Sequence, residues 1–172
     1  MKWAKRAILF FGGFFGSMLF VYIAGSFLPR EHGIRRSREL AYSPGVIWAL
    51  IASPHELPRW RRGIVSVTQL PNREGKPMYR EDADYGKINY VIELVEEPKR
   101  FRTRVVDNPA FGGTRMLELE PMPGGCRITI TDQGWIENPM TRFLTHHIYG
   151  YDLSLEGYFE DLEAALVKIP KT

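Results

Sequence analysis

The sequence lacks most of the short motifs that carry chemistry. Its 172 residues include one cysteine, Cys126, which excludes an intrachain disulfide and has no partner at zinc-ligand spacing. The patterns G-x-S-x-G, G-x-x-x-x-G-K-[ST] and G-x-G-x-x-G are all missing. Serine-nucleophile, P-loop and dinucleotide-binding sites therefore have no support. We expect no metal site and no cofactor, and no residue can be named as catalytic.

Histidine is also scarce, with four residues in the chain: His32, His55, His146 and His147. His146 and His147 are adjacent in a stretch with helical periodicity, so their side chains diverge and do not form a metal site. His147 falls on the apolar side of that stretch. It is either a polar contact in a cavity or a hydrogen-bonded histidine at the edge of a core.

A basic stripe suited to nucleic acid is absent, although the whole chain has a net charge of +3. Residues 1–38 hold 7 of the 23 basic side chains and 1 of the 20 acidic ones. Residues 39–172 therefore carry a net charge of −3. Because the basic excess flanks an apolar segment, the charge distribution points to a membrane surface and not to a phosphate backbone.

Residues 7–28 form an uncharged run that, as a helix, would be about 33 Å long, enough to cross a membrane. We expect an N-terminal single-pass anchor over residues 1–29 and a globular domain over residues 30–172. A cleaved signal peptide is the alternative. Basic residues on both sides leave the orientation open, with a preference for the N-terminus inside. Gly12 and Gly16 are spaced for weak helix–helix self-association, although glycine is common in such helices.

The region after the apolar run alternates apolar and polar residues between turn-forming residues, which is typical of strands. The clearest case is residues 87–95, where Ile88, Tyr90 and Ile92 alternate with polar residues. The expected strands are 33–42, 64–70, 78–82, 87–95, 100–106, 114–120 and 126–136, with two short helices over 44–51 and 55–60. Short turns between consecutive strands predict an antiparallel sheet and an α+β fold.

The C-terminal part has helical periodicity from Pro139 to about Lys168. Its apolar residues recur at steps of three and four, so they share one face. Asn138 before Pro139 is a good N-cap followed by a good first helical residue. We therefore expect one long amphipathic helix packed on the sheet. Gly150 and Gly157 lie within it and reduce side-chain bulk, either for a ligand or for close contact with a strand.

This order of elements resembles the helix-grip fold of the START/Bet v 1-like superfamily (SRPBCC), including polyketide cyclase/dehydrase-like and lipid-transport members. Similar local signatures are the segment 43–51, the segments 57–60 and 97–100, and Phe111-Gly112-Gly113-Thr114. The resemblance covers about residues 34–168. It implies a curved sheet of about six or seven strands wrapped around the C-terminal helix, with an apolar cavity between them.

On this basis we expect a set of aromatic, aliphatic and polar side chains to line the cavity. The candidates are Trp48, Trp60, Tyr79, Tyr90, Arg104, Phe111, Asp132, His147, Tyr151, Leu155, Tyr158 and Phe159. Arg104 and Asp132 lie mid-strand, where each is either a polar anchor for a ligand or half of an ion pair on the outer face. Phe111-Gly112-Gly113 is either a mobile flap over the cavity or a hairpin loop.

The resulting functional hypothesis is membrane-tethered binding, or transport, of a hydrophobic small molecule or lipid. We weigh binding above catalysis. The first alternative is an enzyme resembling polyketide cyclases/dehydrases, using Asp132, Arg104 or His147. The second alternative is an interaction scaffold with a solid core, which a cavity too small for a ligand would favour.

Overall fold

The computed structural model describes residues 2–169, with side chains for residue 3 and residues 12–169. Its elements follow the expected order, with a helix, a strand, short helices, six further strands and C-terminal helices. The bounds are α1 Lys2–Ser26, β1 Glu31–Leu40, α2 Pro44–Ile51, η1 Pro54–Glu56, α3 Leu57–Trp60, β2 Ile64–Arg73, β3 Lys76–Ala83, β4 Gly86–Glu96, β5 Arg100–Val106, β6 Phe111–Met122, β7 Gly125–Ile136, α4 Pro139–Leu144, η2 Thr145–Tyr149 and α5 Leu153–Leu166. The α+β class is confirmed.

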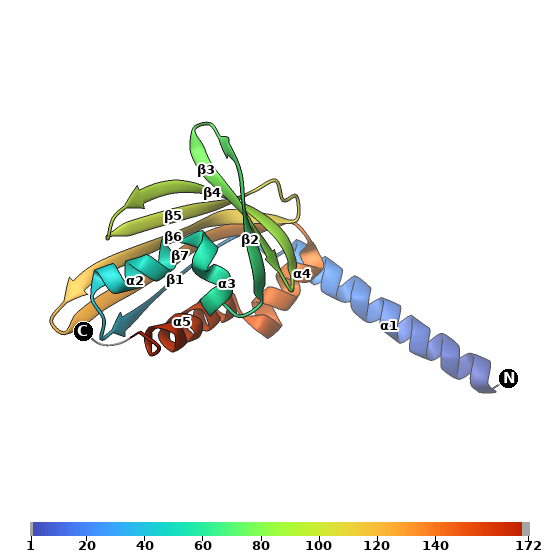
Figure 1. The fold of residues 1–172 in the computed structure, drawn as a ribbon. Coiled ribbons are helices and arrows are strands. Elements are labelled where there is room, and N and C mark those ends of the chain that lie inside the picture. Colours follow the sequence, from blue (N-terminus) through green and yellow to red (C-terminus); the bar gives the residue numbers. More distant parts are fainter. Residues whose placement is uncertain (1, 170–172) are drawn as a thin grey trace.

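The strands form one seven-stranded antiparallel sheet in the order β1-β7-β6-β5-β4-β3-β2. Apart from β1, which pairs with the last strand, each strand pairs with its neighbour in the sequence. The sheet curves over α5, while α2 and α3 lie between them (Figure 1). This arrangement is consistent with the helix-grip fold, since a curved sheet must bury its apolar concave face against something.

The main core lies between the concave face of the sheet and the helices α2, α3 and α5. Its fully buried side chains are Phe159, Ile47, Ile128, Ile130, Leu155, Leu162 and Leu166, together with Cys126. Charged side chains fix α5 to the sheet edge. Arg38 of β1 donates to Glu156 at 2.7 Å and to Glu163 at 2.8 Å, and its guanidinium lies 5.1 Å from the Phe159 ring centroid.

The prediction of one long C-terminal helix is wrong, because the chain breaks at Gly150. Asn138 caps α4 as expected, accepting from the backbone N–H groups of Met140 and Thr141. The π-helix η2 then ends where the Gly150 N–H donates to the Thr145 carbonyl at 2.8 Å. Gly150 has φ +76° and ψ 150°, outside the helical region, and α5 starts afresh at Leu153.

The segment Phe111-Gly112-Gly113 is neither a flap nor a loop, and this expectation is corrected as well. It is the first part of β6 and pairs with β7, where Phe111 lies opposite Ile136 and Gly112 opposite Trp135. A side chain at Gly112 would fall 2.7 Å from the Trp135 Nε1 atom. The glycines therefore permit close packing of two strands and do not provide a hinge.

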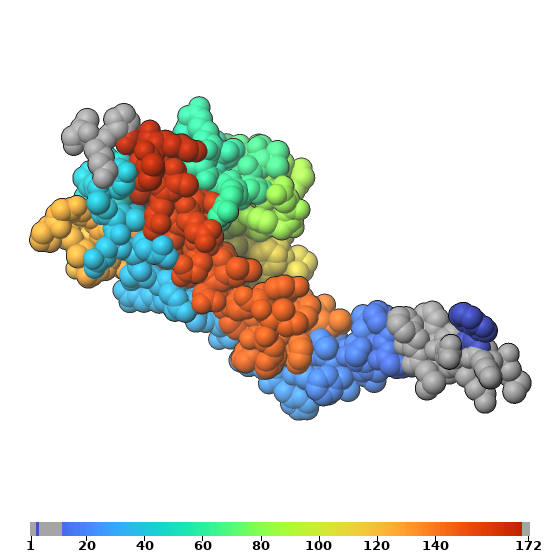
Figure 2. Space-filling view, turned by 90° about the horizontal axis from the view of Figure 1, so that it is seen from below, coloured from blue at the N-terminus to red at the C-terminus, as the bar shows by residue number. Residues whose placement is uncertain are grey.

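The N-terminal segment forms the helix α1, which projects from the domain and ends against α4 (Figures 1 and 2). Gly25 leaves no space for a side chain beside Pro139, and the rings of Phe20 and Phe143 lie 6.5 Å apart. Within the described part of the chain, we find no helix with the length and apolarity needed to cross a membrane. The transmembrane anchor expected over residues 7–28 is thus not supported. The division at residue 29 and the Gly12–Gly16 contact stay predictions.

Candidate functional site

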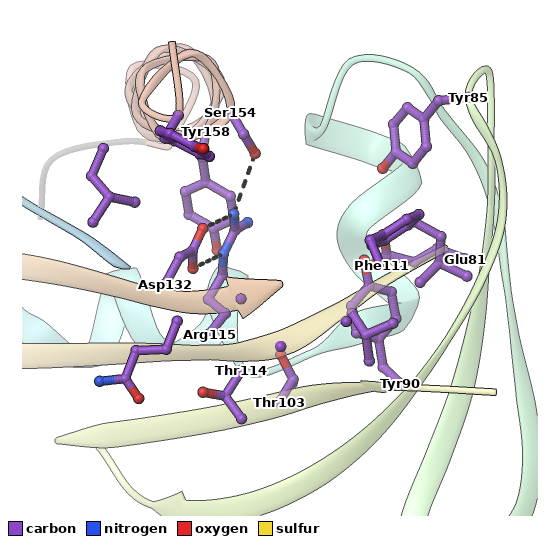
Figure 3. Close-up of a pocket in the computed structure, with 18 of the residues that line it drawn as sticks. Glu81, Tyr85, Tyr90, Thr103, Phe111, Thr114, Arg115, Asp132, Ser154 and Tyr158 are labelled. Carbon is purple, nitrogen blue, oxygen red and sulfur yellow. Dashed lines mark hydrogen bonds and ion pairs between the residues drawn. The ribbon is translucent and has the colours of Figure 1, made fainter. Parts of the chain in front are cut away.

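A cavity of about 570 Å³ lies between the concave face of the sheet and the helices α3, η2 and α5. Its apolar walls include side chains of α2, α3 and the strands β1, β4, β5 and β6, which are Ile34, Ile51, Leu57, Ile88, Phe101, Val105 and Leu117. Polar side chains gather in two groups on opposite sides of it (Figure 3). Arg115, Asp132, Ser154 and Tyr158 are on one side, and Glu81, Tyr85 and Tyr90 on the other.

Strand register explains which side chains reach the cavity. Alternate residues of a strand share a face, so the residues paired with an inward-facing residue also face inward. Thr103 of β5 lies opposite Arg115 of β6, and Arg115 lies opposite Asp132 of β7. These three neighbours therefore form one row across the concave face, and all of them line the cavity.

Arg115 and Asp132 form a bidentate ion pair within this row. The Nε and Nη2 atoms of Arg115 donate to the two carboxylate oxygens at 2.8 and 2.6 Å, and Nη2 also lies 3.3 Å from the Ser154 hydroxyl. Burial alone lowers the pKa of Arg115, but the hydrogen bonds and charge of Asp132 outweigh it, and the net pKa is raised. Arg115 is thus a permanent cation whose charge is already matched.

Arg61 is the second cation of the cavity wall, and the carboxylate that balances its charge does not line the cavity. It donates to Asp161 of α5 at 2.8 Å, and its guanidinium lies 4.7 Å from the Tyr158 ring centroid. Asp161 is only 5% exposed and also accepts from the backbone N–H and the side chain of Arg62. This network fixes the middle of α5, and with it Tyr158, against the chain between α3 and β2.

Glu81 is the buried carboxylate on the opposite wall, with 7% of its surface exposed. Its β3 position pairs with Ile88, while Tyr79 pairs with Tyr90, so Glu81 and Tyr90 are diagonal neighbours on one face. Burial raises the pKa of Glu81, although Arg115, Arg61 and a hydrogen bond with Tyr90 pull it down. Burial and the nearby Glu81 carboxylate also raise the pKa of Tyr90.

The mouth of the cavity is formed where the C-terminal helices break. Tyr149, Gly150, Tyr151 and Leu153 line it on this side, and the Tyr151 ring stacks on His32 at 4.5 Å. Burial lowers the pKa of His32, against a raising effect of the Asp132 charge. His32 is therefore mostly neutral at pH 7. The cavity is open at this end because the C-terminal helical segment, which was predicted to be continuous, is interrupted at Gly150.

Six of the twelve predicted cavity residues line the cavity: Tyr79, Tyr90, Phe111, Asp132, Tyr151 and Tyr158. Trp48, Leu155 and Phe159 are instead buried in the core, and Trp60 packs edge-on behind Tyr158 with ring centroids 5.3 Å apart. Arg104 pairs with Glu93 across β4 and β5, and the His147 ring packs against Phe143. Whether the six lining residues bind a ligand stays a prediction.

Sequence reasoning missed Glu81, Arg61 and Arg115. Arg115 had a usable signal, because it alternates with Leu117 and Leu119, two apolar residues of the expected strand 114–120. Glu81 lies two residues after Tyr79 in β3 and therefore shares its face of the strand, but a single charged residue in a short strand usually faces solvent. Within residues 2–169 as described, no three His, Cys, Asp or Glu side chains are grouped as metal ligands.

The site can therefore enclose an apolar molecule and meet its polar end with fixed hydrogen-bonding groups. The ion pairs of Arg115 and Arg61 also have a structural role, because each fixes the geometry of one cavity wall. Glu81 is different, since it offers a carboxyl group that no ion pair occupies among the described residues. This combination of a mostly apolar wall and few convergent polar groups is typical of small-molecule sites.

Comparison with known proteins gives the family. The family model for polyketide cyclase / dehydrase and lipid transport matches residues 31–154, and the chain belongs to this family. Curated proteins yielded no match in sequence. A START superfamily protein from Mycobacterium smegmatis is similar in structure, with a TM-score of 0.65, 16% identity, and coverage of 81% of this chain and 99% of the other.

Two enzymes of known structure share the fold at lower identity. The first, norcoclaurine synthase from Thalictrum flavum, has a TM-score of 0.62 at 11% identity over 81% of this chain and 96% of that one. The second, the di-domain ARO/CYC protein StfQ of the steffimycin biosynthetic pathway, has a TM-score of 0.63 at 9% identity over 78% of this chain and 50% of that one. At these identities the likeness establishes the fold alone.

Proposed function

We propose that this member of the polyketide cyclase / dehydrase and lipid transport family binds a hydrophobic or amphipathic small molecule in the cavity under the sheet. The observation that carries the proposal is the cavity of about 570 Å³ with apolar walls and polar groups at fixed positions. Its size falls within the roughly 300–1,000 Å³ typical of small-molecule sites.

Binding would be driven by removal of apolar surface from water. At about 25 cal/mol per Å² of buried apolar area, the walls formed by residues such as Ile88, Phe101 and Leu117 favour a ligand with a long or fused apolar body. The polar groups on either side would orient the ligand. Breaking existing hydrogen bonds of Arg115 would cost free energy, so the ligand is expected to accept from or stack on this pair without replacing Asp132.

We further propose that α1 holds this cavity near a membrane that supplies or receives the ligand. The uncharged run of residues 7–28 and the exposed apolar side chains of Phe14, Phe15, Leu19 and Phe20 support the proposal. Because α1 ends against α4, the mouth beside η2 would lie next to the attachment point. Flotation of the full chain with phosphatidylcholine vesicles tests this, and a chain that stays at the bottom of the gradient contradicts it.

The family and the structural neighbours are compatible with a cyclase-like enzyme, but the geometry of the site favours neither alternative drawn from the sequence. A scaffold with a solid core would not contain a cavity of this size. The catalytic groups considered for a cyclase-like enzyme are not assembled, because Arg104 and His147 lie outside the cavity and Asp132 is paired with Arg115. Binding is therefore the function that the geometry favours.

Titration of the full chain with the neutral apolar fluorophore N-phenyl-1-naphthylamine tests the binding proposal. Ser154 is an exposed residue of α5 that lines the cavity, so Ser154→Trp would obstruct it with little effect on folding. Ala164→Trp, at another exposed position of α5 outside the cavity lining, is the matched control. We expect saturable binding that Ser154→Trp weakens at least tenfold and Ala164→Trp does not. Absence of binding, or equal binding by both variants, contradicts the proposal.

A further inference from the structure

We propose that the ligand carries a protonated amine, which pairs with the carboxylate of Glu81 inside the cavity. This inference rests on the proposed binding function and names the chemical class of the ligand's polar end. It follows from the distribution of charge on the cavity walls, from the aromatic surroundings of Glu81 and from the burial of its carboxyl group.

The charges on the cavity walls are matched with one exception. Arg115 is paired with Asp132, and Arg61 is paired with Asp161, in both cases through hydrogen bonds no longer than 2.8 Å. Among the residues that the structure describes, Glu81 has no Lys, Arg or His nitrogen within 4.0 Å. Its described contact is the hydrogen bond with Tyr90, which is neutral. The cavity is lined by two arginines and two carboxylates, and because Arg61 is paired with Asp161 outside the lining, Glu81 is the carboxylate left without a cation.

The position of Glu81 separates it from the matched pair. Figure 3 shows Arg115 and Asp132 on one side of the cavity and Glu81 on the other. Arg115 and Arg61 act on Glu81 only through longer-range attraction, which does not overcome the effect of burial on the Glu81 pKa. A buried carboxylate that is not paired with a cation is costly, and a cation that enters the cavity reduces this cost.

Tyrosine rings surround Glu81. Tyr79 shares its face of β3, and Tyr90 on β4 stacks on Tyr79 with ring centroids 5.2 Å apart and planes inclined by 17°. Tyr85, in the turn between β3 and β4, is near enough that the Glu81 charge raises its pKa. The faces of aromatic rings attract cations, so the same wall that isolates the carboxylate is favourable to an ammonium group.

The other classes of polar end fit less well. An anionic head would meet Glu81, and both cavity arginines already hold carboxylates. A neutral hydroxyl could hydrogen-bond to Glu81 in either protonation state but would leave the charge unmatched. We therefore expect affinity to decrease in the order amine, alcohol, acid for ligands with the same apolar body.

Decylamine, 1-decanol and decanoate, titrated calorimetrically into the full chain at pH 7, provide the test. We expect decylamine to bind about tenfold or more tightly than 1-decanol, and decanoate to bind most weakly. Glu81→Gln keeps the shape but not the charge, so it should abolish the preference for decylamine while leaving 1-decanol binding within about threefold. Glu118→Gln, on β6 outside the cavity lining, is the matched control and should change neither.

The outcomes separate the two proposals. If none of the three compounds binds, the proposed binding function fails. If 1-decanol or decanoate binds as tightly as decylamine, or if Glu81→Gln keeps the preference for decylamine, the cavity binds ligands but the amine assignment is overturned. Equal loss of 1-decanol and decylamine binding in Glu81→Gln also overturns it, because Glu81 would then act through the shape of the wall.

Discussion

The concave face of the sheet is filled at one end and hollow at the other. On β7 the inward-facing residues Ile128 and Ile130 are fully buried in the core, whereas Asp132 and Gly134, further along the same face, line the cavity. On β6 the same change occurs between Leu119 and Arg115. The same face of the sheet therefore contributes to the core at one end and to the cavity wall at the other. The side chains at alternate positions along each strand determine this difference.

The helices reinforce this difference between the filled end and the open end. At the filled end, α2 contributes Ile47 and Trp48, and α5 contributes Phe159, so side chains occupy the space under the sheet. At the open end, the helical chain breaks at Gly150 and presents Ser154 to the cavity. The comparison indicates that stability is concentrated at the filled end, which leaves the open end free to keep polar groups that a core would not tolerate.

The largest effect is expected from Ile128→Ala, which deletes side-chain volume at the filled end. Ile128 is 0% exposed, so the variant should lose about 2–5 kcal/mol of unfolding free energy through lost transfer energy and a residual cavity. Leu153→Ala, at the mouth, is the control, because Leu153 is 63% exposed and should lose less than about 0.5 kcal/mol. Urea denaturation measures both. Equal losses would contradict the division between the two ends.

Asp161→Asn tests the connection between the two ends and should have the next largest effect. It removes the charge that matches Arg61, which lines the cavity, and leaves that guanidinium poorly compensated. We expect a loss of about 2–3 kcal/mol in urea denaturation, less than for a fully buried pair because Arg62 is exposed. The exposed neighbour Glu160, changed to Gln, should lose less than about 1 kcal/mol.

The two glycines of the C-terminal segment should respond in opposite directions. Gly150→Ala forces a side chain into a positive-φ conformation and should destabilise by about 1–3 kcal/mol. Gly157 lies inside α5 with open space around its Cα, so Gly157→Ala should stabilise by about 0.5–1 kcal/mol. Thermal unfolding of both variants measures the difference. Stabilisation by Gly150→Ala would mean that the chain is helical there and that the mouth is not built as described.

The smallest effect concerns Glu81 without ligand and depends on pH. Because burial raises its pKa above the ordinary value of 4.5, Glu81 favours the folded state most when protonated, and this contribution is lost as pH rises through the folded-state pKa. Glu81→Gln should therefore be more stable than the natural chain at pH 8, by on the order of 1 kcal/mol. The advantage should shrink as pH falls toward 4.5. A stability difference that does not depend on pH would contradict the inference that Glu81 is a buried carboxylate without a cation.

Much of the fold was predictable from local patterns. The alternation in residues 87–95 placed β4 within one residue at each end, and Asn138-Pro139 marked the start of α4. The break at Gly150 was not predictable, because the apolar periodicity continues through it and glycine is tolerated within helices. The strand at Phe111 was missed because Gly112 and Gly113 are typical of a loop unless another strand packs closely on them.

The candidate site was only half predictable, for a physical reason. Aromatic residues such as Trp48 and Tyr90 are equally suited to filling a core and to lining a cavity, and only the fold decides between these roles. The Arg115–Asp132 pair depends on the register of two strands, which no local pattern specifies. The isolation of Glu81 depends on where the basic side chains of several strands lie, because none of those described comes within 4.0 Å of its carboxylate, and this is a property of the assembled sheet.

Native mass spectrometry of the full chain, purified from cells without added ligand, tests most directly whether the open end of the sheet binds a small molecule. We expect a reproducible additional mass that is present in Ala164→Trp, absent in Ser154→Trp, and released as an apolar compound by solvent extraction. A chain that carries no additional mass and takes up neither N-phenyl-1-naphthylamine nor decylamine would contradict the proposed binding.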